Sequence, residues 1–341
     1  MTGSVLPAAL KILISLLPVL VFLLALVFLD SYKLVRLRVL IIAILGGAAA
    51  AAVGYYANSW LMGFFQDNFA AYSRYAAPLV EELLKAAVLL AFFQAHRVGF
   101  LVDGAILGFA VGAGFSLFEN IYYLNTAPEA EFIVWAVRGL GTAMMHGGMT
   151  AILAAVTKAV SDRRSLSPWI AALPGLLIAA AVHSAFNHFL LPPMAMAAAM
   201  LVLLPLVAVN VFVISEKSTR KWLDVGFDSD VELLGCITSG RACSTKVGAY
   251  LVSLKGKFPG EVVADMLCLL RLHLELSISA KGLLLMKEAG LPAKTDPNIP
   301  EKFEELKYLE KSVGRTGMLA VGPILHRSRR DLWELHMLGM N

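Results

Sequence analysis

Long apolar stretches separated by short polar connections make up most of the chain up to residue 215. A helix needs about 20 mainly apolar residues to cross a bilayer. Seven stretches come close to this length, at residues 8–29, 38–57, 76–95, 98–124, 132–158, 168–190 and 194–215. The pattern predicts an all-α fold, a polytopic membrane bundle of about seven transmembrane helices. The first stretch lacks a basic leader and a small-residue cleavage site, so we expect a retained helix rather than a signal peptide.

Charged residues become frequent from Glu216 onward. This change predicts two domains, a transmembrane domain at residues 1–215 and a polar C-terminal domain at residues 216–341. In the second domain apolar residues recur at helical spacing, which predicts further helices. We expect them at residues 230–236, 258–289, 301–311 and 325–338, the first of them capped from within residues 226–230.

The composition is that of a membrane protein. Hydrophobic residues make up 58% of the 341 positions, whereas soluble domains are usually about 45–50% apolar. The formal net charge is only +4, and the basic residues gather at predicted helix ends and in the tail, which argues against a nucleic-acid partner. Cys236, Cys243 and Cys268 lie in the tail without a tight CxxC pair, which argues against a disulfide framework.

Basic residues are concentrated in every second connection between the predicted spans. Cytoplasmic loops of membrane proteins carry an excess of lysine and arginine. The amino terminus is therefore expected outside and the tail in the cytoplasm. The basic connections follow the first, third, fifth and seventh spans and contain Lys33, Arg36, Arg38, His96, Arg97, Lys158, Arg163, Arg164, Lys217, Arg220 and Lys221.

The third span carries three charged residues close together, Glu81, Glu82 and Lys85. An ionised side chain near the bilayer centre costs about 2.5–3.5 kcal/mol, so these residues need partners or a function. Lys85 lies three residues after Glu82 and four after Glu81, so its ammonium can reach either carboxylate. Burial beside a second carboxylate also favours proton uptake, which suits a general base.

The fourth span ends in a second acidic site, Glu119 followed by Asn120. Gly104, Gly108 and Gly112 precede it at intervals of four residues, a spacing that predicts close packing against another helix. Glu119 continues the same face and is expected to point into the bundle in the outer half of the bilayer.

The fifth and sixth spans add histidines at a similar depth. Arg138 and His146 are eight residues apart on one face of the fifth span, and His183 and Asn187 share a face of the sixth at a spacing of four. A single histidine in a membrane helix is more often a hydrogen-bonded helix contact than a ligand. The convergence of four helices at one depth is harder to explain by packing alone.

Glutamate and histidine are both zinc ligands, and a catalytic zinc site has about three protein ligands and one open position for water. A remaining carboxylate would act on that water as a general base. No serine or cysteine nucleophile in the spans is as well placed. The sequence therefore predicts metal-assisted hydrolysis inside the membrane, with zinc as the cofactor.

Four short motifs that occur in one order along residues 75–190 carry a family resemblance. They are Glu81-Glu82-x-x-Lys85, Phe115-x-x-x-Glu119-Asn120, His146 and His183-x-x-x-Asn187. In their order and helix placement they resemble the PrsW family of bacterial intramembrane peptidases, relatives of the CAAX prenyl endopeptidase and of bacteriocin-immunity membrane proteins.

The resemblance implies an endopeptidase of the glutamic or metallo type. One glutamate of the first pair would activate water, and the asparagine would polarise the substrate carbonyl as an oxyanion donor. Glu119 would bind either the metal or the water. The implied assignment is catalysis by Glu81, Glu82 and Asn187, metal binding by Glu119, His146 and His183, and support from Lys85, Asn120 and Arg138.

PrsW-like proteins are similar to proteases that cleave single-span anti-sigma factors near the outer face of the membrane. The resemblance therefore implies a membrane-anchored protein substrate, and a location in the bacterial cytoplasmic (inner) membrane. Residues 216–341 lie outside the resemblance. We expect this tail to bind a cytoplasmic regulator or to dock on the helices.

Two other functions use the same residue types. A proton-coupled transporter would place carboxylates, Arg138 and histidines along a path through both halves of the bilayer, but the predicted cluster occupies one half and no inverted repeat is evident. A non-catalytic scaffold or immunity-type protein would keep the polar cluster and act through its tail.

Overall fold

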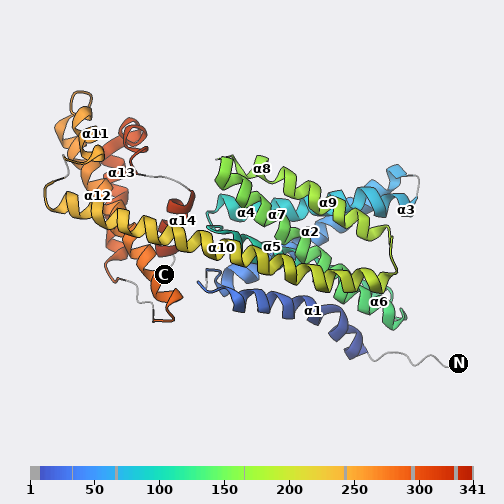
Figure 1. The fold of residues 1–341 in the computed structure, drawn as a ribbon. Helices are drawn as coiled ribbons and strands as arrows, with labels where there is room; N and C mark the ends of the chain where they lie inside the picture. The colour runs from blue at the N-terminus through green and yellow to red at the C-terminus, as the bar shows by residue number, and fades with distance from the viewer. Residues whose placement is uncertain are drawn as a thin grey trace. The chain divides into compact units, whose positions relative to one another are not determined.

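A computed structural model describes residues 8–32, 34–65, 68–164, 166–241, 244–292, 296–325 and 329–339, and their regular structure is helical (Figure 1). The predicted all-α class is confirmed. The chain divides into two compact units, residues 1–215 and 216–341. Lys33 and Cys243, which entered the sequence predictions, lie outside the described residues.

The first unit contains helices joined by short connections. Two of its α-helices, α4 and α7, directly follow π-helical turns, η2 and η3 respectively. The helices are α1 (Ala8–Leu29), α2 (Leu37–Met62), the 3₁₀ turn η1 (Gly63–Phe65), α3 (Phe69–Ala71), η2 (Tyr72–Ala76), α4 (Ala77–Gln94), α5 (Leu101–Thr126), α6 (Phe132–Ala136), η3 (Val137–Thr142), α7 (Ala143–Arg164), α8 (Pro168–Ala171), α9 (Leu173–Asn187) and α10 (Pro193–Thr238).

Within the described residues, six helical stretches are long and apolar enough to cross a membrane. They correspond to six of the predicted spans, and the chain is an integral membrane protein. The remaining predicted span, residues 76–95, forms α4, which is 18 residues long and carries Glu81, Glu82 and Lys85. It is not one of the six, because it carries three charged residues within this length. Instead of facing lipid as an apolar rod, α4 packs against α2, α5 and α9.

Helix α5 lies at the centre of the first unit and is buried along most of its length. The predicted glycine packing face is confirmed where α5 crosses α7. A Cβ atom added to Gly112 would lie 2.2 Å from the carbonyl oxygen of His146, and one added to Gly108 would lie 2.5 Å from that of Thr150. Only glycine permits backbones to approach this closely, so these positions set the distance between α5 and the helix that carries His146.

Pro78 has no N–H group, so it cannot donate the usual helical hydrogen bond to the carbonyl of Arg74 in η2, four residues before it. Helix α9 donates to this carbonyl and to its neighbour: Oγ of Ser184 lies 2.6 Å from the Arg74 oxygen, and Nδ2 of Asn187 lies 2.9 Å from the Ser73 oxygen. These side chains join α9 to the start of α4.

The second unit contains the end of α10 followed by α11 (Lys246–Leu254), α12 (Gly260–Glu288), α13 (Ile299–Val321) and α14 (Arg329–Gly339). Helix α12 packs against α13 and α14. The predicted helices at 258–289, 301–311 and 325–338 correspond to α12, α13 and α14. The predicted capped helix at 230–236 is wrong, because α10 continues without a break to Thr238.

Candidate active site

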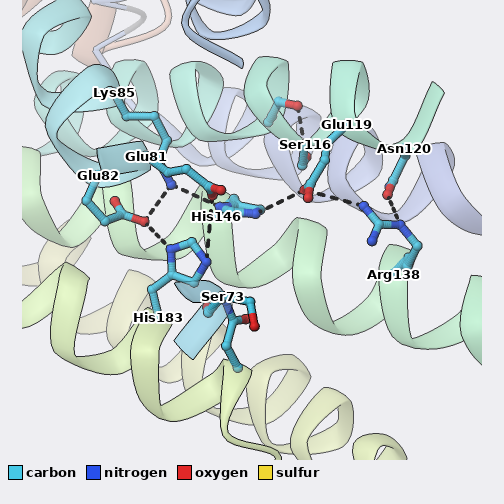
Figure 2. A network of polar contacts seen from close by, with 12 residues as sticks. Ser73, Glu81, Glu82, Lys85, Ser116, Glu119, Asn120, Arg138, His146 and His183 are labelled. Carbon is cyan, nitrogen blue, oxygen red and sulfur yellow. Dashed lines mark hydrogen bonds and ion pairs between the residues drawn. The ribbon is translucent and has the colours of Figure 1, made fainter. Parts of the chain in front are cut away.

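The structure brings the predicted site residues together from four parts of the first unit. Glu81, Glu82 and Lys85 come from α4, Glu119 and Asn120 from α5, Arg138 and His146 from η3 and α7, and His183 from α9. Figure 2 shows a continuous series of polar contacts that runs from the glutamates of α4 through the two histidines to Glu119 and Arg138.

Glu82 and Lys85 form a buried ion pair. Both side chains are fully buried, and Lys85 Nζ lies 2.5 Å from Glu82 Oε1. The predicted i,i+3 contact is therefore present. Lys85 also lies 2.9 Å from Nδ1 of His146. A buried charge is tolerated only when it is paired and hydrogen-bonded, so Glu82 and Lys85 stabilise one another.

His183 connects the two adjacent glutamates. Its Nδ1 atom lies 2.9 Å from Oε1 of Glu82, and its Nε2 atom lies 3.8 Å from Oε2 of Glu81. An ionised carboxylate only accepts hydrogen bonds, so Nδ1 donates to Glu82. In the neutral ring Nε2 then carries a lone pair that faces Glu81. A histidine held by a carboxylate in this way is the usual arrangement of a metal-binding imidazole.

His146 makes polar contacts through both ring nitrogens. The Lys85 ammonium only donates, so Nδ1 of His146 accepts from it and Nε2 is the protonated nitrogen. That Nε2 atom lies 3.3 Å from Oε2 of Glu119. The ring stands at 89° to that of His183, with 4.8 Å between centroids, and packs on Phe115. A metal bound by His146 would replace one of its two polar contacts.

Arg138 holds the acidic residue of α5 from the opposite side. One of its terminal nitrogens lies 3.4 Å from Oε2 of Glu119, and its Nε donates to Oδ1 of Asn120 at 2.8 Å. Asn120 in turn donates to the Ser15 carbonyl of α1 at 2.7 Å. The guanidinium also lies over the ring of Tyr123, with 3.7 Å from its central carbon to the ring centroid. Arg138 and Asn120 therefore fix the place of Glu119.

A cavity of about 470 Å³ opens onto this cluster. Glu81, Glu119, His146 and His183 are among its lining residues, whereas Glu82 and Lys85 are not. The adjacent glutamates of α4 therefore differ in access: Glu81 faces the cavity, and Glu82 lies behind His183. The other walls are largely aromatic, with Phe118 and Tyr122 from α5 among them.

Asn187 also lines the cavity. One N–H of its amide is used by the Ser73 carbonyl. The amide nitrogen carries two N–H groups, and the second is the one that the predicted oxyanion role would use.

Two residues of this site, Asn58 and Tyr72, were missed by the sequence analysis. Asn58 Nδ2 donates to Oε1 of Glu81 at 3.1 Å, and the Tyr72 hydroxyl lies 2.7 Å from Oδ1 of Asn58. The available signal was weak, since Asn58 is a single amide near the end of an apolar helix. Tyr72 gives no signal, because aromatic residues are common at the ends of membrane helices.

Three ligand-type residues gather closely enough to bind a metal ion. One oxygen of Glu81 and one nitrogen each of His146 and His183 all lie within 4.8 Å of one another. One carboxylate and two imidazoles match the donor set of a catalytic zinc site. On the adjoining cavity wall, Oε2 of Glu119 lies 3.4 Å from a terminal nitrogen of Arg138 and 3.3 Å from Nε2 of His146, but makes no hydrogen bond of normal geometry. These residues therefore fit a bound metal and water.

These features define the chain as an all-helical membrane protein with a buried group of potential metal ligands on the wall of a cavity. The chain belongs to the PrsW family of intramembrane metalloproteases, whose defining pattern matches residues 35–214, just over half of the chain. Comparison with curated proteins and with solved structures finds no match. The resemblance inferred from the short motifs is confirmed at the level of the family.

Proposed function

We propose that this protein hydrolyses a peptide bond of a membrane-anchored protein, with zinc bound by Glu81, His146 and His183. The observation that carries the proposal is the approach of three ligand atoms to within 4.8 Å on the wall of one cavity. Glu82 behind His183 supports it, because metal-binding histidines are usually oriented by a carboxylate.

Glu119 is proposed as the general base. It lies 3.3 Å from His146, lines the same cavity and is outside the group of three ligands. Its carboxylate would take a proton from the attacking water and pass it to the leaving amine. This assignment exchanges the roles that the resemblance implied for Glu81 and Glu119. A zinc ion at the site would polarise the substrate carbonyl and acidify bound water.

The remaining residues would orient the substrate. The second N–H of Asn187 is proposed to donate to the carbonyl oxygen as negative charge develops on it. Glu82 and Lys85 would not touch substrate, because both are fully buried and outside the cavity lining. The proposed role of Glu82 is to orient His183, and that of Lys85 is to neutralise Glu82.

Glutamine variants of the two cavity-facing glutamates test these roles. Elemental mass spectrometry of the detergent-purified protein measures bound zinc. Cleavage is measured in liposomes that contain single-span membrane proteins of the anti-sigma-factor type. We expect Glu81→Gln to lose zinc and cleavage together, and Glu119→Gln to keep zinc while losing cleavage. The opposite pattern would reverse the two roles. A wild-type protein that neither binds zinc nor cleaves would overturn the proposal.

The proposed location is the bacterial cytoplasmic membrane, with the amino terminus outside and the tail in the cytoplasm. The alternation of basic connections supports this orientation. The native tail cysteines, including exposed Cys268, should react with a membrane-impermeant maleimide only after cells are opened. A cysteine introduced by Glu129→Cys, with the native cysteines replaced, should react in intact cells. The reverse result would invert the topology.

The tail, residues 216–341, is proposed to bind a cytoplasmic regulator. Its support is a separate compact unit outside the matched family region. Deletion of residues 216–341 tests the idea by cross-linking and cleavage assays in cells. Unchanged partners and unchanged cleavage would remove it.

A further inference from the structure

The two carboxylate oxygens of Glu81 have different surroundings. Oε1 accepts a hydrogen bond from Nδ2 of Asn58 at 3.1 Å, while Oε2 faces Nε2 of His183 at 3.8 Å. We propose that Asn58 and Tyr72 are positioning residues that restrict Glu81 to binding the metal through Oε2 alone. This inference rests on the proposed function, in which Glu81 is a metal ligand.

The direction of the hydrogen bonds follows from the carboxylate. An ionised Glu81 only accepts, so the Asn58 amide must present its nitrogen to Glu81 and its oxygen to Tyr72. An amide oxygen also only accepts, so the Tyr72 hydroxyl must donate across the 2.7 Å contact. The hydrogen bonds of this series therefore have only one possible direction. Tyr72 sets the orientation of the Asn58 amide, and Asn58 sets the orientation of Glu81.

The three residues of this hydrogen-bond series come from three separate elements. Asn58 lies on α2, Tyr72 on η2 and Glu81 on α4. Tyr72 is only 3% exposed, and its ring packs edge-on against Phe65 at a centroid distance of 5.1 Å. The packing fixes the hydroxyl, so Asn58 does not rely on water to keep its orientation. A side-chain amide in a membrane helix is costly without a partner, and here both ends of the amide are used.

The consequence is a defined coordination number. A catalytic zinc site combines three protein ligands with one position for water or substrate. If both oxygens of Glu81 bound the metal, they would occupy two positions and crowd that open site. The hydrogen bond from Asn58 keeps Oε1 away from the metal. Removing a residue that hydrogen-bonds to a metal ligand typically lowers metal affinity or activity about 10–100-fold.

The test replaces each donor by an apolar group of similar shape, Asn58→Leu and Tyr72→Phe. The matched controls are Ser59→Ala, whose hydroxyl bonds within its own helix to the Tyr55 carbonyl, and Tyr75→Phe, whose ring is largely exposed. Each purified full-length protein is titrated with Zn²⁺ by competition against a chelating dye. The Co²⁺-loaded form gives a visible absorption spectrum that reports coordination number.

We expect Asn58→Leu to weaken Zn²⁺ binding about 10–100-fold and to lower the Co²⁺ absorption intensity, as a change from four to five ligands does. Tyr72→Phe should shift both measurements in the same direction by less. Because the residues act in series, the double variant should resemble Asn58→Leu alone. The two controls should match the wild type. A purely structural role would lower the melting temperature without changing the Co²⁺ spectrum of the folded protein.

The outcomes separate this inference from the proposed function. If the wild type binds zinc and Asn58→Leu keeps the wild-type affinity and Co²⁺ spectrum, the positioning role is wrong while the zinc protease remains. If the wild type binds neither Zn²⁺ nor Co²⁺, both proposals fail.

Discussion

The Nδ1 atom of His183 lies 2.9 Å from Oε1 of Glu82, behind the cavity that the neighbouring residue Glu81 lines. Two consecutive carboxylates therefore have different environments. Glu82 contacts a histidine and neutralises Lys85, whereas Glu81 lines the cavity. The difference arises because neighbours on a helix point about 100° apart, and only one of those directions leads into the cavity.

Glu82→Gln should strongly destabilise the folded protein, although Glu82 does not line the cavity. It keeps the shape but leaves the buried Lys85 ammonium without its counter-charge, and breaking a buried pair costs about 3–5 kcal/mol. Thermal denaturation in detergent measures the change. The control is Glu304→Gln, whose ion pair with Lys307 is 75% and 69% exposed, and which should cost at most about 1 kcal/mol. Equal melting temperatures for the two variants would contradict a buried ion pair at α4.

His183→Ala should remove metal-dependent stabilisation. A ligand that binds only the folded state raises stability by about 2.7 kcal/mol at a concentration 100 times its Kd. We therefore expect added Zn²⁺ to raise the melting temperature of chelator-treated wild type and to leave that of His183→Ala unchanged. His188→Ala is the matched control, since His188 bonds to the Ser184 carbonyl and packs on Tyr75. An equal zinc response in His183→Ala and the wild type would exclude His183 as a ligand.

Gly112→Ala should push α5 away from α7. The added Cβ would lie 2.2 Å from the carbonyl oxygen of His146, and overpacking typically costs about 1–3 kcal/mol. Because the displaced backbone carries His146, zinc affinity should fall as well. Gly63→Ala meets no atom within 4 Å and should change neither property. Melting temperature and zinc titration give both answers, and a neutral Gly112→Ala would refute the close helix contact.

Pro78 and Ser184 should be coupled energetically. The Ser184 hydroxyl bonds to the Arg74 carbonyl, which has lost its helical donor to Pro78. A hydrogen bond contributes about 0.5–1.5 kcal/mol, so Ser184→Ala should cost about that much. In a Pro78→Ala background the restored N–H can serve the carbonyl, and the same change should cost less. A double-mutant cycle measured by thermal denaturation tests this; strict additivity would argue against it.

Glu275 in the second unit predicts a pH dependence. Partial burial raises its pKa, but hydrogen bonds from Arg271 and Lys302 outweigh this effect and leave the pKa below its usual value. A lowered folded-state pKa adds stability above the unfolded pKa of about 4.3, and that stability is lost as pH falls through the folded value. Glu275→Gln should therefore weaken the α12–α13 contact at pH 7 by no more than about 1 kcal/mol.

Hydrogen exchange of the α12 and α13 amides in the full-length protein measures this difference. At neutral pH the variant should exchange slightly faster than the wild type. The difference should shrink below the usual glutamate pKa and disappear in stronger acid. A difference that persists or grows at low pH would contradict the lowered pKa.

Much of the architecture follows from hydropathy and local spacing. The apolar stretches predicted the helices of the first unit closely, because a helix in lipid must satisfy its backbone internally and must be long enough to span. The pairing of Glu82 with Lys85 follows from the i,i+3 spacing. The gathering of α4, α5, α7 and α9 could be inferred because buried charges in a membrane must find partners.

The sequence by itself determined the helices, the membrane character and most residues of the polar cluster. Only the tertiary structure decided which glutamate of the α4 pair faces the cavity. Only the tertiary structure placed Asn58 and Tyr72 beside Glu81. It also showed that α10 continues through residues 230–236, where a separate capped helix was predicted. The physical reason is that spacing along one helix fixes which side chains share a face, whereas the neighbour of each face depends on how several helices pack. The glycines of α5 set that packing, and the hydrogen bonds across it select the role of each polar side chain.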